Sequence, residues 1–127
     1  MRRASTFIPI HFLFIILLSL LSFPCCSKAD PSITLHQTEV QPGAKITVEF
    51  SDIQNPIAQD WISIYKVGTP NEQYGEWYYL KGEKSGSLTF TAPYEEGTYE
   101  FRLFLNWPEG KYEDVAKSRI ITVRKNQ

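Results

Sequence analysis

The sequence predicts an all-β domain, and three observations support this fold class. Short runs of β-branched and aromatic residues alternate with clusters of Gly, Pro, Asn and Asp. Turn signals recur roughly every eight to twelve residues, and no stretch after residue 29 shows the apolar period of a helix. Of the 127 residues, 98 follow residue 29, enough for one hydrophobic core and too few for two. We therefore expect a single domain at 30–127.

An export signal is predicted for residues 1–29. Two arginines precede an apolar run at 7–23, and small residues follow at 27–29. This order is typical of a signal peptide, so we expect cleavage after Ala29 and a secreted, periplasmic or cell-surface product. The alternative is an uncleaved anchor, the only membrane contact we expect, although the run is short for a bilayer span.

The two cysteines, Cys25 and Cys26, both precede the expected cleavage site. If the N-terminal segment is retained, lipid attachment at either cysteine is a further alternative. If it is removed, the mature domain contains no cysteine and therefore no disulfide. Packing alone must then stabilise it, whereas small exported domains commonly depend on disulfides.

The first two predicted strands cover 32–36 and 45–50, with the turn Gln41-Pro42-Gly43 between them. Apolar and polar residues alternate along the second strand, which predicts one buried face and one solvated face. The third strand, 61–65, consists of β-formers and ends at Gly68-Thr69-Pro70. Since an indole buries a very large apolar area, Trp61 is expected to lie between two sheets.

Four more strands are predicted at 76–81, 87–91, 98–106 and 118–123. A total of about seven short strands is typical of an immunoglobulin-like antiparallel β-sandwich. Val48, Trp61 and Phe101 occupy the positions that meet in the core of such domains, here without a disulfide. Tyr99, two residues before Phe101, is expected to form a tyrosine corner, with its hydroxyl bonded to the preceding turn.

Five segments spread over nearly all of 30–127 share a further pattern. They are Pro42-Gly43 with Ile46-Thr47-Val48, Asp60-Trp61-Ile62-Ser63-Ile64-Tyr65-Lys66-Val67-Gly68, Tyr74 with Trp77 and Tyr79-Leu80, Gly97-Thr98-Tyr99-Glu100-Phe101-Arg102-Leu103-Phe104, and Val115-Ala116-Lys117-Ser118. These segments resemble SKICH and SKICH-like immunoglobulin-like domains, including modules of bacterial surface proteins. They are also similar to the N-terminal domain of some plant purple acid phosphatases. The resemblance implies a non-catalytic β-sandwich that contacts proteins or places a neighbouring domain.

Composition argues against several functions. Ten Lys and Arg residues and fourteen Asp and Glu residues follow residue 29, a formal charge of −4, and the basic residues are scattered, so we expect no nucleic-acid partner. The one remaining histidine, His36, excludes the common zinc sets and disfavours a catalytic triad. Acidic pairs at 95–96 and 113–114 lack the ligand series of a calcium loop. We expect no enzyme, metal or cofactor, and a small hydrolase is the least favoured alternative.

Aromatic residues gather on the fourth predicted strand and around the turn at 107–110. Neighbouring strand residues point to opposite faces, so Tyr78 is expected to point outward if Trp77 and Tyr79 enter the core. Edge-strand packing would account for some of these rings. The functional hypothesis for these rings is an exposed binding patch formed by Tyr74, Tyr78, Trp107 and Tyr112. It predicts a protein-interaction or adhesion module, with a carbohydrate-binding module as the alternative.

Overall fold

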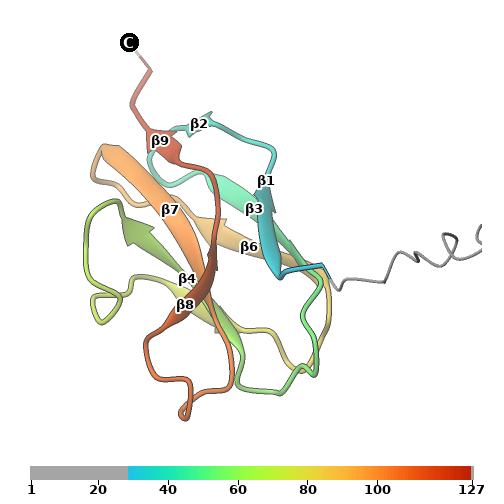
Figure 1. The fold of residues 1–127 in the computed structure, drawn as a ribbon. Coiled ribbons are helices and arrows are strands. Elements are labelled where there is room, and N and C mark those ends of the chain that lie inside the picture. Colours follow the sequence, from blue (N-terminus) through green and yellow to red (C-terminus); the bar gives the residue numbers. More distant parts are fainter. Residues whose placement is uncertain (1–28, 127) are drawn as a thin grey trace, which may run out of the picture.

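The computed structural model describes residues 29–126, which form a β-sandwich of two sheets and contain no helix (Figure 1). The predicted signal peptide, with Cys25 and Cys26, lies outside these residues apart from its last position. The strands described are β1 (Ser32–Leu35), β2 (Glu39–Val40), β3 (Lys45–Ser51), β4 (Trp61–Lys66), β5 (Trp77–Tyr79), β6 (Gly86–Thr91), β7 (Gly97–Phe104), β8 (Asp114–Lys117) and β9 (Ile121–Val123). The predicted fold class, an all-β sandwich, is confirmed, and residues 29–126 contain no cysteine that could form a disulfide.

The smaller sheet has the order β1-β3-β6, and the larger has the order β2-β9-β7-β4-β5, with β8 paired to β7. Figure 1 shows β1, β3 and β6 towards the right and β4, β7 and β8 towards the left. The longest pairing in the larger sheet is antiparallel, between β4 and β7, and runs from Trp61 opposite Phe104 to Lys66 opposite Tyr99. These two strands provide the base of the site described below.

The main hydrophobic core fills the space between the sheets. Burial alternates along β3 as its sequence predicts, with Ile46, Val48 and Phe50 buried and the residues between them exposed. The larger sheet contributes buried side chains from β4 and β7: Ile62, Ile64, Tyr99, Phe101 and Leu103. Each fully buried large apolar side chain contributes about 1.5–3 kcal/mol to folding, so this core is the main source of stability.

Trp61 is buried, but it does not lie between the sheets. Ile62 and Ile64 belong to the main core, and Trp61 points to the opposite face of β4 because side chains alternate along a strand. Its indole stacks on Phe104 of β7, with ring centroids 4.3 Å apart, in a separate cluster with Tyr65. The prediction that two sheets close on Trp61 is therefore wrong. Loops rather than a second sheet cover this outer face of the larger sheet.

Tyr99 forms the bond expected of a tyrosine corner, since its hydroxyl donates to the carbonyl of Glu95 at 2.8 Å. The strand pattern differs from the prediction at two places. The two-residue strand β2 pairs in parallel with β9 and was not predicted. The strand β8, at Asp114–Lys117, was not predicted either, and of the last predicted strand, 118–123, only β9 forms, with Ser118 to Ile120 between β8 and β9. There the Ser118 hydroxyl accepts the hydrogen bond from the amide of Phe101, so a side chain replaces a strand carbonyl.

Candidate binding site

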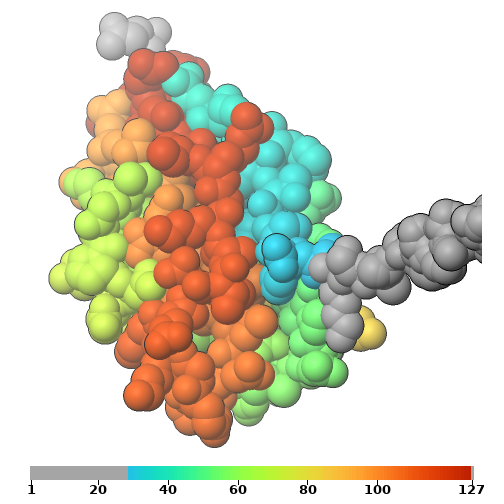
Figure 2. Space-filling model, in the orientation of Figure 1, coloured from blue at the N-terminus to red at the C-terminus, as the bar shows by residue number. Residues whose placement is uncertain are grey.

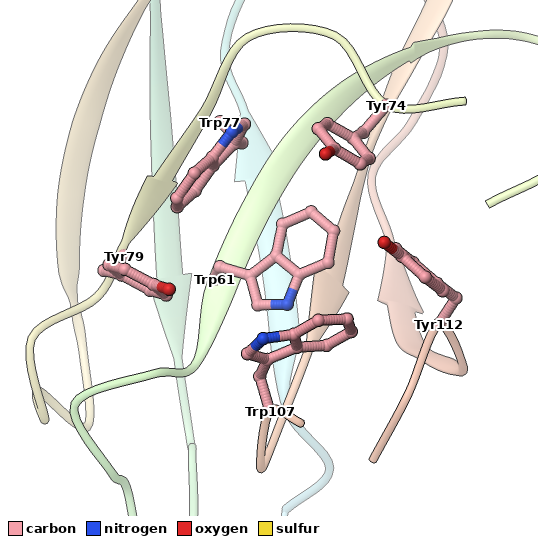
Figure 3. Close-up of a pocket in the computed structure, with 6 residues that line it drawn as sticks. All are labelled: Trp61, Tyr74, Trp77, Tyr79, Trp107 and Tyr112. Carbon is pink, nitrogen blue, oxygen red and sulfur yellow. The ribbon is translucent and has the colours of Figure 1, made fainter. Parts of the chain in front are cut away.

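The outer face of the larger sheet carries a hollow of about 170 Å³ lined by six aromatic side chains (Figure 3). They are Trp61, Tyr74, Trp77, Tyr79, Trp107 and Tyr112. These residues come from β4, from β5 and the connection that precedes it, and from the β7–β8 connection. We call this hollow the aromatic pocket. It brings together segments separated by about fifty residues of chain.

Trp61 forms the floor of the aromatic pocket, and the other rings surround it (Figure 3). Four of them stand nearly perpendicular to the Trp61 plane, with interplanar angles between 73° and 87° and centroids 5.7–6.2 Å from its own: Tyr74, Trp77, Trp107 and Tyr112. Edge-to-face contacts of this kind are favourable beyond the area they bury. The floor is only 5% exposed, whereas Tyr74 is 46% exposed and Trp77 39%. The geometry is that of an open box with aromatic walls.

Strand β5 places Trp77 and Tyr79 on the pocket side because they are two residues apart and share a face. In the ladder Tyr79 lies opposite Trp61. Tyr78 points the other way, with its ring 5.0 Å from Phe90 of the main core. The condition under which Tyr78 was expected to point outward, that Trp77 and Tyr79 enter the core, is therefore not met.

The structure brings three of the four residues of the predicted patch together. Tyr74, Trp107 and Tyr112 converge on the aromatic pocket, and Tyr78 does not. Of the other three lining residues, the sequence analysis assigned Trp61 to the core and left the face of Trp77 and Tyr79 open. The sequence of β4 does contain a signal that Trp61 lies outside the main core. One face of the strand is aliphatic, with Ile62 and Ile64, and the opposite face carries Ser63 between two aromatic residues.

Arg102 anchors the β4–β5 connection, the first of two loops that cover the outer face of the larger sheet. Its side chain is only 4% exposed, and it forms an ion pair with Glu100 at 2.8 Å. The guanidinium also donates to the carbonyl of Thr69 at 2.8 Å and to the side-chain oxygen of Asn71 at 2.6 Å. It lies 4.2 Å from the ring centroid of Tyr65, a cation–π contact. One buried cation thus anchors the β4–β5 connection.

Asn71 links that loop to the second. Its amide nitrogen donates to the carbonyl of Tyr112 at 2.9 Å and to the carboxylate of Asp114 at 2.8 Å. The Tyr65 hydroxyl donates to the Asn71 carbonyl at 2.7 Å. Burial raises the pKa of Tyr65, although the Arg102 guanidinium opposes the shift, so this donor keeps its proton. The network ties the loop of Asn71 to that of Tyr112, and the rings of Tyr74 and Tyr112 lie with their centroids 6.3 Å apart.

Figure 2 shows the outer surface over these loops, with the β4–β5 connection in yellow-green beside the β7–β8 connection in orange. Asp60 fixes the start of the second loop. Its buried carboxylate accepts hydrogen bonds from the amide of Asn106 at 2.8 Å and from the amide of Ile57 at 2.9 Å. Both loops are therefore tied to the sheet by buried polar side chains.

The polar side-chain atoms of the lining residues are three phenol hydroxyls and three indole N–H groups, with no side-chain carboxylate, amide, imidazole or ammonium group. The Trp61 Nε1 is buried and has no hydrogen-bond partner. In Figure 3 it points towards the Trp107 indole, whose plane is 86° from that of Trp61. An N–H directed at an aromatic ring is a weak but real contact. The aromatic pocket therefore offers mainly π surface.

A second hollow adjoins the aromatic pocket and shares Trp107 and Tyr112 with it. Its other lining residues are Glu72, Pro108, Lys111 and Glu113. We call it the acidic hollow, because two carboxylates and one ammonium group line it. Together the two hollows make a continuous surface that changes from aromatic to charged.

Residues 29–126 hold no group of three or more His, Cys, Asp or Glu side chains placed to share a metal ion. Within the same range there is no helix of the length and apolarity that crossing a membrane requires. No protein-family model matches the chain, and no curated protein matches it.

Proposed function

We propose that this chain is an exported, non-catalytic binding module with an immunoglobulin-like fold, and that it holds a protein partner at the aromatic pocket. The convergence of six aromatic rings on one hollow carries the proposal. Aromatic residues dominate the energetics of many protein interfaces, since they bury large rigid surfaces at small entropic cost. Clustered exposed rings commonly mark an interaction surface.

The way the loops are held supports the same function. Buried polar contacts of Arg102, Asn71 and Asp60 fix both loops before any partner arrives. A preorganised site loses less conformational entropy on binding than a mobile one. The resemblance to SKICH-like modules agrees with a contact role, and the predicted export signal alone favours a location outside the cytoplasm.

The experiment compares a pocket variant with a variant of the opposite face of the same strand. The double variant Trp77→Ala/Trp107→Ala removes two walls, and Tyr78→Ala removes a ring that is 40% exposed, close to the 39% of Trp77. Immobilised proteins are exposed to extracellular material from the producing cells, and retained proteins are identified by mass spectrometry. We expect a partner retained by the wild type and by Tyr78→Ala but lost by the double variant. Identical retention by all three proteins would contradict the proposal.

A carbohydrate-binding module is the second candidate, favoured by the exposed adjacent rings of Trp77 and Tyr79, whose centroids are 4.9 Å apart. Sugars stack on such rings, but their hydroxyls also need polar side chains of the kind that the lining lacks. A glycan array separates the two candidates. Binding of a defined glycan that disappears in Trp77→Ala would favour the carbohydrate, and a silent array with folded protein would reject it.

A further inference from the structure

The group that the aromatic pocket accepts follows from what its lining offers and what it lacks. Six π systems surround the space, and only phenol oxygens are available there as side-chain acceptors. A ligand group with several N–H or O–H donors would leave some of them unpaired, which is costly in a desolvated site. The lining therefore favours a group that is attracted to π faces and has no donors of its own.

A quaternary ammonium group has these properties. Its positive charge is attracted to aromatic ring faces within about 6 Å, and its methyl groups carry no hydrogen-bond donor. The perpendicular walls around Trp61 present such rings on several sides, with centroids 5.7–6.2 Å from that of the floor. The volume of about 170 Å³ suits one group of this size, since a cavity of about 150 Å³ admits benzene.

The charges beside the pocket indicate what carries the cation. The acidic hollow continues from the walls Trp107 and Tyr112, and Glu72 and Glu113 outnumber Lys111 in it. A ligand that extended across this surface would meet a net negative charge, on a domain whose formal charge is −4 after residue 29. This favours a basic polypeptide segment over a small isolated cation, which would leave the acidic hollow unfilled.

We propose that the aromatic pocket binds the quaternary ammonium group of a trimethylated lysine, carried by a basic segment of the protein partner. The inference rests on the proposed function and specifies its ligand. The trimethylammonium lies between the aromatic walls that surround Trp61, and flanking basic residues of the segment pair with Glu72 and Glu113. Binding needs no covalent step and no metal ion.

The test uses three peptides that are identical except at one central residue flanked by arginines. That residue is lysine, trimethyllysine or a neutral isostere in which a tert-butyl group replaces trimethylammonium. Each peptide is titrated into the purified protein and followed by the indole signals of Trp61 and Trp107 in NMR spectra. We expect trimethyllysine to bind about tenfold more tightly than either of the other two, because only it combines charge with the absence of donors.

Variants and free cations locate the interaction. Trp107→Ala should abolish trimethyllysine binding, and Tyr78→Ala should leave it unchanged, since that ring faces Phe90. The double variant Glu72→Gln/Glu113→Gln should weaken the peptide several-fold and reduce its salt dependence. Choline and tetramethylammonium should bind the aromatic pocket more weakly than the peptide and be insensitive to the double variant.

Two outcomes would overturn this inference while leaving the binding module intact. Equal affinity for the neutral isostere would show that the aromatic pocket recognises shape rather than charge. Choline binding as tightly as the peptide would show that the acidic hollow makes no contribution and that the carrier is not a polypeptide. The proposed function itself fails only if the wall variants also retain every captured partner.

Discussion

Replacement of Trp61 by alanine distinguishes the floor of the aromatic pocket from the core between the sheets. A buried Trp→Ala change in a core costs about 3–5 kcal/mol. The Trp61 side chain is 5% exposed and stacked on Phe104, so most of its contacts would be lost. Side chains from two loops cover it, however, and these can partly collapse into the vacated space. We therefore expect a loss in unfolding free energy of about 3 kcal/mol, at the lower end of the range.

A domain of this size has a free energy of unfolding of about 5–15 kcal/mol, so Trp61→Ala should remain folded at 25 °C. Trp61→Phe keeps a ring on Phe104 and should cost less. Ile62→Ala is the matched control, since Ile62 is the next residue and lies between the sheets. Its expected cost is about 2–5 kcal/mol. Urea unfolding followed by circular dichroism measures all three variants.

Which residues change their NMR signals in each variant tests the position of Trp61 more sharply than the loss in unfolding free energy does. In Trp61→Ala the methyl signals of Ile64 and Leu103 should stay near their wild-type positions, while the indole signals of Trp77 and Trp107 shift. Ile62→Ala should show the reverse pattern. Large shifts of the Ile64 and Leu103 methyl signals in Trp61→Ala, or an unfolded protein, would refute the placement of Trp61 outside the main core.

Two further predictions concern the polar contacts beneath the loops. Arg102→Met leaves the Glu100 carboxylate without its cation and should lower the unfolding free energy by about 3–5 kcal/mol in urea titrations, with part recovered by adding Glu100→Gln; no loss would show that the ion pair is dispensable. Because burial raises the folded-state pKa of Tyr65, the folded protein keeps this proton where the unfolded chain releases it, so stability should fall as pH rises above about 10. Urea midpoints between pH 8 and pH 11 measure the effect, and Tyr65→Phe should reduce the fall of the midpoint with pH. An unchanged fall in this variant would show that Tyr65 is not the group responsible.

The strand β3 shows where sequence reasoning works. Its polar residues mark the solvated face, so the alternation identifies the core side without any partner strand. Strand β4 shows where it fails, since every residue from Trp61 to Tyr65 is buried and the pattern contains no wet face. Burial of Trp61 could be predicted from its size. The direction in which Trp61 points depends on which side of β4 packs against the second sheet. The aliphatic pair Ile62 and Ile64 fits the narrow space between the sheets, so Trp61 points the other way.

The pocket walls were predictable to different extents. Tyr74, Trp107 and Tyr112 fall in loops, which predicts exposed rings; Tyr74 is exposed, whereas Trp107 and Tyr112 are partly buried because they pack against the Trp61 cluster. For β5 the period of two establishes only that Trp77 and Tyr79 share a face. Which face they share is decided by the β4–β5 ladder, and no local signal in a three-residue strand reports that pairing.

Arg102 explains why the site as a whole is difficult to find in the sequence. Charged residues alternating with Phe101 and Leu103 in β7 are typical of a solvated outer face, yet the structure buries both Glu100 and Arg102. Loops cover them, and the cost of removing two charges from water is offset by their pairing and by hydrogen bonds to loop atoms. A sandwich that needed only to fold could leave this face wet. Because the two loops cover this face and bond to its buried charges, their aromatic residues are held in a fixed geometry.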